Sequence, residues 1–173
     1  MPEVTRMKLR SVLEEIDRAA PFALAADWDN VGLMVGDPDR EVRRLGIALD
    51  PLPEAVAEAA ERGCEALLTH HPLFFSPIRR LDLSRDPGRA VLAAVERGVA
   101  VLAAHTNWDS AEGGVSFELA RLLGLRDVSV LDPDARLGGG REFRRTPYGR
   151  GGAGAGQAGL GIVVARRLRV REL

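Results

Sequence analysis

The sequence is poor in the features that mark secreted and membrane-spanning proteins. It contains one cysteine, Cys64, so no disulfide can form within the chain. No apolar run approaches the roughly 18 residues of a membrane-spanning helix, and no basic-then-apolar leader follows Met1. We therefore expect a protein of the reducing cytoplasm that has no membrane partner.

Lysine and histidine are also scarce. Lys8 is the only lysine, and the formal net charge of -1 argues against a general nucleic-acid binder. Many of the arginines gather late in the chain, where they favour a basic arm for nucleic acid as an alternative interpretation. Only Phe143 and Tyr148 are interleaved with them as stacking platforms, so we expect no nucleic-acid partner.

Two parts of the chain differ in composition. With 173 residues, 46% of them hydrophobic, the chain is long enough for one globular domain, which we place at residues 1–137. Residues 138–173 are rich in glycine, alanine and arginine, and such a segment cannot bury much apolar surface. We expect it to form a flexible tail.

Apolar periodicity in the first part predicts an α/β fold, with a mixed, largely parallel sheet flanked by helices. An unalternating apolar run at 45–50 is typical of a strand buried on both faces. Asp86 and Pro87 suit the N-cap and the first position of a helix. The predicted strands are 33–35, 45–50, 65–69, 99–104 and 128–131, with a weaker candidate at 160–164. The predicted helices are 7–20, 51–62, 86–97 and 115–123, and residues 106–109 are expected to form a loop.

The strongest chemical signal is the position of the histidines. His70 and His71 directly follow one predicted strand, and His105 follows the next, with Asp109 four residues later. The carboxyl ends of parallel strands lie at one edge of a sheet, so these side chains should meet there. Because side chains alternate along an extended chain, His70 and His71 should point apart unless the chain bends. Divergent imidazoles suit two metal ions better than one.

The residue types at this edge suit a divalent metal ion. Imidazole nitrogens and carboxylate oxygens are ligands for zinc, manganese or iron. Asp27 and Asp29, in a turn-rich segment, are further candidate metal or substrate ligands, although loop carboxylates more often cap turns. The histidines also have a structural alternative, in which they cap the sheet through hydrogen bonds alone.

Three segments, at residues 27–33, 68–75 and 105–115, resemble the NIF-three-like family, which is also described as GTP cyclohydrolase I type 2. The resemblance covers about residues 7–131. It implies an α/β fold, of which this chain would be the first half, with a dinuclear metal centre. It also implies a homo-hexamer.

The resemblance also implies roles for single residues. His70, His71 and Asp109 match metal ligands of the family. His105 matches a position next to the site that is either a ligand or a donor that orients one. The positions that match the family's early loop near the pocket are Trp28 and Asn30.

The chain departs from the family at its C-terminal end, which is truncated or divergent. Family members are longer, and a His-x-x-x-Glu motif in their second half completes the metal pair. Here no histidine follows His105, and the residues from about Gly138 resemble nothing in the family. We therefore expect weaker binding of metal, with one ion where the family holds up to two.

These features favour a metal-dependent hydrolase in which a metal-bound water attacks a small phosphorylated, nucleotide or heterocyclic substrate. His105 or Asp29 would shuttle a proton. Two alternatives stay open. One is a non-catalytic metal-binding scaffold that binds a partner, and the other is an inactive fragment with exposed apolar surface.

Overall fold

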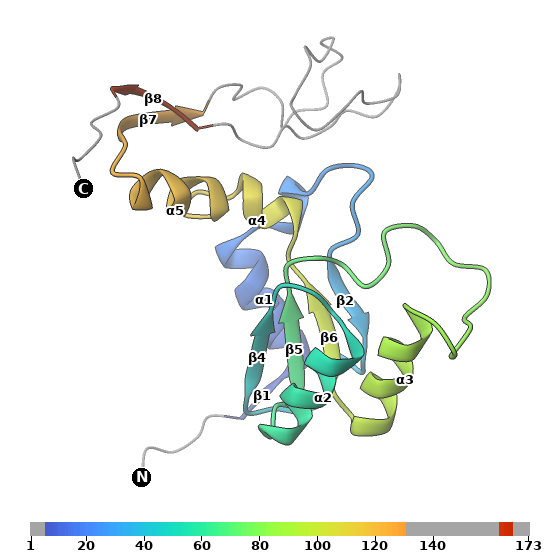
Figure 1. The fold of residues 1–173 in the computed structure, drawn as a ribbon. Helices are drawn as coiled ribbons and strands as arrows, with labels where there is room; N and C mark the ends of the chain where they lie inside the picture. Colours follow the sequence, from blue (N-terminus) through green and yellow to red (C-terminus); the bar gives the residue numbers. More distant parts are fainter. Residues whose placement is uncertain (1–5, 131–162, 168–173) are drawn as a thin grey trace.

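The computed structural model describes residues 6–130 and 163–167 (Figure 1). Helices and strands alternate along most of this part of the chain, as the α/β prediction requires. The strands are β1 (Met7–Lys8), β2 (Gly32–Val35), β3 (Glu41–Val42), β4 (Leu45–Ala48), β5 (Ala66–Thr69), β6 (Ala100–Ala103), β7 (Arg126–Val130) and β8 (Val163–Arg167). The helices are α1 (Leu9–Ala19), the short 3-10 helix η1 (Phe22–Leu24), α2 (Pro53–Glu61), α3 (Gly88–Arg97), α4 (Thr106–Ser110) and α5 (Val115–Leu122).

A mixed sheet of four strands forms the centre of the fold, in the order β2-β6-β5-β4. Strands β4, β5 and β6 are parallel, and β2 pairs antiparallel with β6. Helix α2 connects β4 to β5 and α3 connects β5 to β6, which are the crossover connections that parallel neighbours need. The predicted mixed, largely parallel sheet is confirmed, and its parallel strands end at one edge, beneath α4 (Figure 1).

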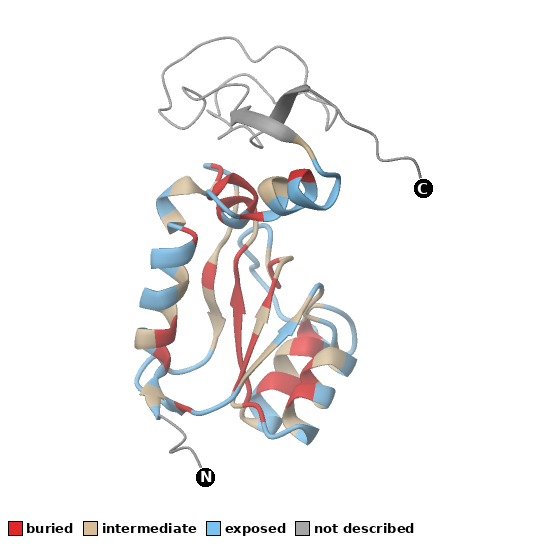
Figure 2. Ribbon diagram, turned by 90° about the vertical axis from the view of Figure 1, so that its left-hand side faces the viewer, coloured by how far each residue is buried: buried red, intermediate tan, exposed pale blue. Residues whose placement is uncertain are grey.

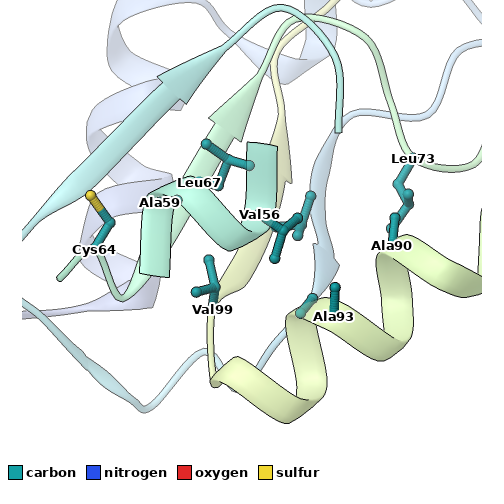
Figure 3. Packing of buried hydrophobic residues seen from close by; sticks show 10 residues of the cluster. Val56, Ala59, Cys64, Leu67, Leu73, Ala90, Ala93 and Val99 are labelled. Carbon is teal, nitrogen blue, oxygen red and sulfur yellow. The ribbon is translucent and has the colours of Figure 1, made fainter. Parts of the chain in front are cut away.

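Helices cover the two faces of this sheet: α1 lies against one face, and α2 and α3 lie against the other (Figure 2). On the first face, Leu9 and Val12 of α1 pack with Leu102 of β6. On the second face, Val56 of α2 packs in a cluster with Leu67 of β5 (Figure 3). Burying one such side chain stabilises the fold by about 1.5–3 kcal/mol. These two cores hold the strand ends in fixed relative positions.

The start of α3 differs from the prediction. The helix begins at Gly88 and no side chain caps it, so the prediction that Asp86 is its N-cap is wrong. The chain before the helix folds close under it. The Arg89 amide donates to the Arg85 carbonyl at 3.0 Å, and a Cβ on Gly88 would lie 2.0 Å from the Asp82 carbonyl oxygen. Backbone groups of this preceding turn therefore take the place that a capping side chain would have.

Strand β4 also differs from the prediction, because it lies at the edge of the sheet. Ala48 packs against the cluster on the α2 side, but Ile47, which points to the other face, is 80% exposed. The prediction that 45–50 is buried on both faces is therefore wrong. Helix α1 packs on the middle of the sheet and leaves this end of β4 uncovered.

The segment after β6 forms a short helix, α4, so the predicted loop at 106–109 is wrong. Buried polar contacts hold this helix. Asn107 is fully buried and donates to the Ala20 carbonyl at 2.7 Å. The Ala26 amide donates to the Thr106 hydroxyl at 2.9 Å. These partners come from the segment after α1, so the local sequence alone does not specify the helix.

Strands β7 and β8 form an antiparallel pair near α5. The strands predicted at 128–131 and 160–164 are therefore present, with bounds shifted by one to three residues. Residues 138–162 lie outside the described part of the chain, so a flexible tail and a domain boundary at residue 137 stay predictions. Among the residues that the structure describes, no helix has both the length and the apolar character to cross a membrane.

Candidate metal centre

The three histidines meet at the carboxyl edge of the sheet. His70 and His71 directly follow β5, and His105 stands between β6 and α4. One ligand nitrogen from each of the three lies within 4.8 Å of the others. The structure thus confirms that the two strand ends bring these residues together, and we call them the histidine cluster.

His70 and His71 do not point apart, because the chain bends at both residues. Their ring centroids lie 5.2 Å apart. The bend is held by the end of β4 and by Thr69. The His70 and His71 amides donate to carbonyls of Ala48 and Leu49 at 3.2 and 3.0 Å, and the Thr69 hydroxyl donates to the His71 carbonyl at 2.8 Å. The prediction of divergent imidazoles is wrong. The argument that the two side chains suit two metal ions better than one therefore no longer holds.

Each histidine of the cluster has an oxygen acceptor at its Nδ1 atom. The acceptors are the Ala104 carbonyl for His70 at 3.2 Å, Asp50 for His71 at 2.6 Å and Asp29 for His105 at 3.0 Å. A carbonyl or a carboxylate only accepts hydrogen bonds, so each Nδ1 must carry the proton. The lone pair of each neutral imidazole is then on Nε2.

This pattern is the one that metal-binding histidines use. A ligating imidazole donates its other N–H to a carboxylate or a backbone carbonyl, which fixes its tautomer and makes the ligating nitrogen more basic. Three protein ligands with one open position are also the usual arrangement of a catalytic zinc site. The residues present therefore fit a divalent ion. Histidines that only capped the sheet through hydrogen bonds would not need three Nε2 lone pairs gathered at one place.

Asp109, on α4, lies beside the histidine cluster. Its Oδ1 atom is 3.8 Å from Nε2 of His70, and its side chain is mostly buried. Burial raises the pKa of Asp109, and the neighbouring His70 and His105 oppose that shift without cancelling it. A bound cation would favour the ionised carboxylate, so metal binding and proton loss from Asp109 are linked.

Asp29 is an internal anchor of the site. Its side chain is 0% exposed and its Oδ1 atom accepts from His105. The amide of Thr106 donates to Oδ2 at 3.0 Å, and the Thr106 hydroxyl also donates to it. Burial would raise the pKa of Asp29, but these hydrogen bonds and one from the Asn30 amide outweigh it and lower the pKa to about 2. Asp29 is therefore ionised at neutral pH.

The other residues of the 27–33 segment have different environments. Asp27 is exposed, so the structure does not bring it to the histidine cluster. Trp28 lies beside His105, with 6.2 Å between the ring centroids. The Asn30 side chain donates to the Phe74 carbonyl at 2.7 Å. This segment is thus attached both to the start of α4 and to the loop after β5.

Sequence reasoning missed Asp50 and Asn107. Asp50 follows β4, so the rule that strand ends share an edge would have placed it beside His71. The Asn107 side chain accepts from the His105 amide at 2.9 Å and so holds the backbone of that residue. No local signal distinguishes this asparagine, because its role depends on its burial against the segment after α1.

Comparison with known proteins agrees with this geometry. The family model of Duf34/NIF3 (NGG1p interacting factor 3) matches residues 7–171. The chain belongs to this family. The match confirms the resemblance that the motifs carry and corrects its extent, which was expected to end near residue 131. The glycine, alanine and arginine of the C-terminal segment obscure this continuation in the sequence.

Several Duf34/NIF3 relatives match this chain over most of its length. A GTP cyclohydrolase 1 type 2 homolog of Streptomyces coelicolor is 40% identical over 139 residues, which are 78% of this chain and 49% of the relative. A homolog of the same name from Clostridium perfringens is 37% identical over 137 residues, 76% of this chain and 52% of the relative. The chain therefore spans about half the length of the curated relatives that it matches.

Solved structures show the same relation. Reduced HcgD from Methanocaldococcus jannaschii has a TM-score of 0.69 and 37% identity, over 76% of this chain and 53% of HcgD. A Bacillus cereus protein related to NIF3 has a TM-score of 0.70 and 35% identity, over 73% of this chain and 35% of that one. These matches confirm the NIF-three-like α/β fold.

Proposed function

We propose that the histidine cluster binds one divalent ion, and that Asp109 is a further ligand to it. The observation that supports this proposal is the position of the proton on the three imidazoles. Each Nδ1 has a hydrogen-bond acceptor, so the lone pair of each Nε2 is available to coordinate a metal ion. Zinc, manganese and iron all fit such a ligand set. Three histidines and one carboxylate suffice for one ion but leave a second ion short of ligands.

We further propose that the site is that of a metal-dependent hydrolase. A divalent ion supplies a water of lowered pKa, which is a nucleophile at neutral pH. The residues of the chain would position this chemistry: Asp50 and Asp29 orient His71 and His105, and His70 and Asp109 complete the ligand set. A pKa of about 2 favours an orienting role for Asp29 over a proton shuttle.

The substrate that we propose is a small phosphorylated or heterocyclic molecule. The curated relatives are named GTP cyclohydrolase 1 type 2 homolog, and a nucleotide fits both chemical classes. We also propose a homo-oligomer, as the resemblance implies, and a cytoplasmic location. Because the chain covers 49% and 52% of two of these relatives, the activity of the whole relative belongs to this chain only as a proposal.

A hydrolysis screen tests the proposal. The protein, loaded with zinc or manganese, is incubated with nucleoside triphosphates and phosphate esters, beside chelator-treated protein and a His71→Ala variant. His71 is partly exposed, so this variant should keep its fold. We expect turnover that both chelation and the variant reduce at least tenfold. Turnover that both treatments leave unchanged would contradict the proposal.

A non-catalytic metal-binding scaffold is the second candidate. The half-length match favours it, since the resemblance implies a second-half His-x-x-x-Glu motif and this sequence has no histidine after His105. Metal binding without turnover in the same screen would favour the scaffold. The absence of both would favour an inactive fragment.

A further inference from the structure

Two large aromatic side chains stay exposed beside the histidine cluster. Trp28 is 42% exposed and Phe75 is 52% exposed. Both make T-shaped contacts with His105: the Trp28 ring lies 6.2 Å from it at 76°, and the Phe75 ring lies 5.6 Å from it at 81°. Scattered exposed aromatic residues are ordinary, but these two come from separate loops and meet at one residue of the cluster.

The loops that carry these rings are fastened to each other and to the site. The Asn30 side chain, two residues after Trp28, donates to the carbonyl of Phe74, the neighbour of Phe75. Asp29, between Trp28 and Asn30, accepts from Thr106 at the start of α4. The backbones next to both rings are therefore held in place. An aromatic site with fixed walls loses little conformational entropy when it binds a ligand.

Exposed surface of both rings remains available to a ligand. Neither ring is stacked flat on His105, and Trp28 and Phe75 are 42% and 52% exposed. A flat aromatic ring that binds against such a face gains stacking energy, and a nucleobase gains about 1–3 kcal/mol for each aromatic platform. Such a contact recognises the shape and π-face of a ring without needing a charged partner.

We propose that Trp28 and Phe75 form a recognition site for a flat heteroaromatic ring, whose polar substituent reaches the histidine cluster. The proposal rests on the proposed function only for that second contact, at the metal ion. Trp28 and Phe75 would determine specificity: they would select ligands with a planar ring over ligands of the same charge that lack one.

A matched pair of probes tests this proposal. AMP and ribose 5-phosphate share a sugar and a phosphate and differ in the adenine ring. Their binding is measured by calorimetry and by tryptophan emission in a Trp108→Phe background, where Trp28 is the only tryptophan left. We expect AMP to bind about tenfold more tightly than ribose 5-phosphate and to quench the Trp28 emission, which ribose 5-phosphate should not do.

Three variants separate stacking from simple apolar cover. Phe75→Ala and Phe75→Leu should both weaken AMP binding about fivefold to tenfold and leave ribose 5-phosphate unaffected, since leucine keeps the apolar volume but has no π-face. Ile78→Ala, which removes another exposed apolar side chain of the same loop, should change nothing. Circular dichroism confirms that the variants fold. Full AMP affinity in Phe75→Leu would overturn the proposal.

Measurements with and without zinc keep this result apart from the metal proposal. A preference for AMP that persists in chelator-treated protein supports the aromatic site even if no metal binds. Equal affinity for the two probes in protein that does bind zinc would overturn the aromatic site and leave the metal proposal standing.

Discussion

Asp29 connects the histidine cluster to the start of α4, and at the residue scale it makes the sharpest prediction. In Asp29→Asn, the amide NH₂ cannot accept from Nδ1–H of His105, whereas the amide oxygen can still accept from Thr106. The imidazole is then driven to the other tautomer, whose Nε2 carries the proton and cannot bind metal. We expect zinc affinity, measured by competition with a chromophoric chelator, to fall about 10–100-fold.

The matched control is Asp27→Asn, which removes a carboxylate from the same loop that is exposed and outside the cluster. Its zinc affinity should equal that of the parent protein. If Asp29→Asn also keeps the parent affinity, the tautomer argument fails, and with it the orienting role of Asp29.

Acid should remove the contribution of Asp29 to stability. Its pKa is about 2 in the folded protein against an ordinary value of 3.8, so the ionised form is favoured by folding. The stabilisation is therefore complete above about pH 5 and is lost as the pH falls toward 2, with about 2 kcal/mol involved in all. We expect about 1 kcal/mol of this to vanish between about pH 5 and pH 3.

Urea unfolding of metal-free parent and Asp29→Asn proteins measures this loss. The difference in their free energies of unfolding should shrink as the pH falls, because the variant has no carboxylate at this position to protonate. A difference that stays constant from pH 5 to pH 3 would show that the carboxylate is not held in its ionised form.

At the scale of elements, the corner between α4 and α5 depends on one of two adjacent glycines for space. A Cβ on Gly114 would lie 1.8 Å from the Trp108 carbonyl oxygen, whereas nothing lies within 4 Å of a Cβ on Gly113. Gly114→Ala should therefore push α4 aside and destabilise the fold by more than about 2 kcal/mol. Because α4 carries Asp109, zinc affinity should fall as well.

Gly113→Ala is the control for this corner. Its φ of +77° makes alanine cost about 1 kcal/mol through backbone strain alone, with no displacement of α4. Thermal unfolding and zinc titration of the two variants compare these effects. Equal losses of stability and affinity would contradict the steric argument.

Strands β4 and β6 should respond very differently to the loss of an apolar side chain. Leu102 of β6 is fully buried between layers, and Ile47 of the edge strand is mostly exposed. We expect Leu102→Ala to cost about 2–5 kcal/mol in the free energy of unfolding and Ile47→Ala less than about 0.5 kcal/mol. A large cost at Ile47 would mean that another surface covers β4 in solution.

Predictions from the sequence were correct for elements that a local residue pattern specifies. They were wrong where contacts with another part of the chain determine the structure. Unalternating apolar runs correctly indicated strands at β4, β5 and β6, but only the tertiary arrangement makes β4 an edge strand. Helix α4 was missed because Asn107, Thr106 and their neighbours are poor helix formers that buried partners hold in place. The prediction that Asp86 is the N-cap of α3 was wrong for a similar reason, since a preceding turn supplies the capping groups.

At the scale of the whole molecule, topology placed the site better than side-chain direction did. The rule for parallel strands predicted that His70, His71 and His105 would meet, and the structure confirms it. Alternation along an extended chain predicted that His70 and His71 would diverge, and a bend after β5 overturns it. Of the acceptors at Nδ1, the Asp50 carboxylate follows a strand end and the rule for parallel strands would have placed it, whereas no sequence pattern marks the backbone carbonyl of Ala104.

The chain matches about half the length of its curated relatives, and its apolar surface and its histidine cluster differ in how complete they are. Apolar side chains of β4 and α5, including Ile47, Leu119 and Leu122, are exposed in the described part of the chain. The histidine cluster, in contrast, is assembled entirely from residues within that part, and its hydrogen bonds are complete there. We therefore expect the metal site to form in this chain without further protein.

Elemental analysis of the purified protein tests that expectation most directly. We predict close to one zinc, manganese or iron ion for each chain after incubation with the metal and removal of excess, with Asp27→Asn unchanged. His70→Ala and His71→Ala should lose the ion, and Asp109→Ala should hold it less tightly. A parent protein that retains no metal, or alanine variants that retain it in full, would contradict the proposal that the histidine cluster is a metal site.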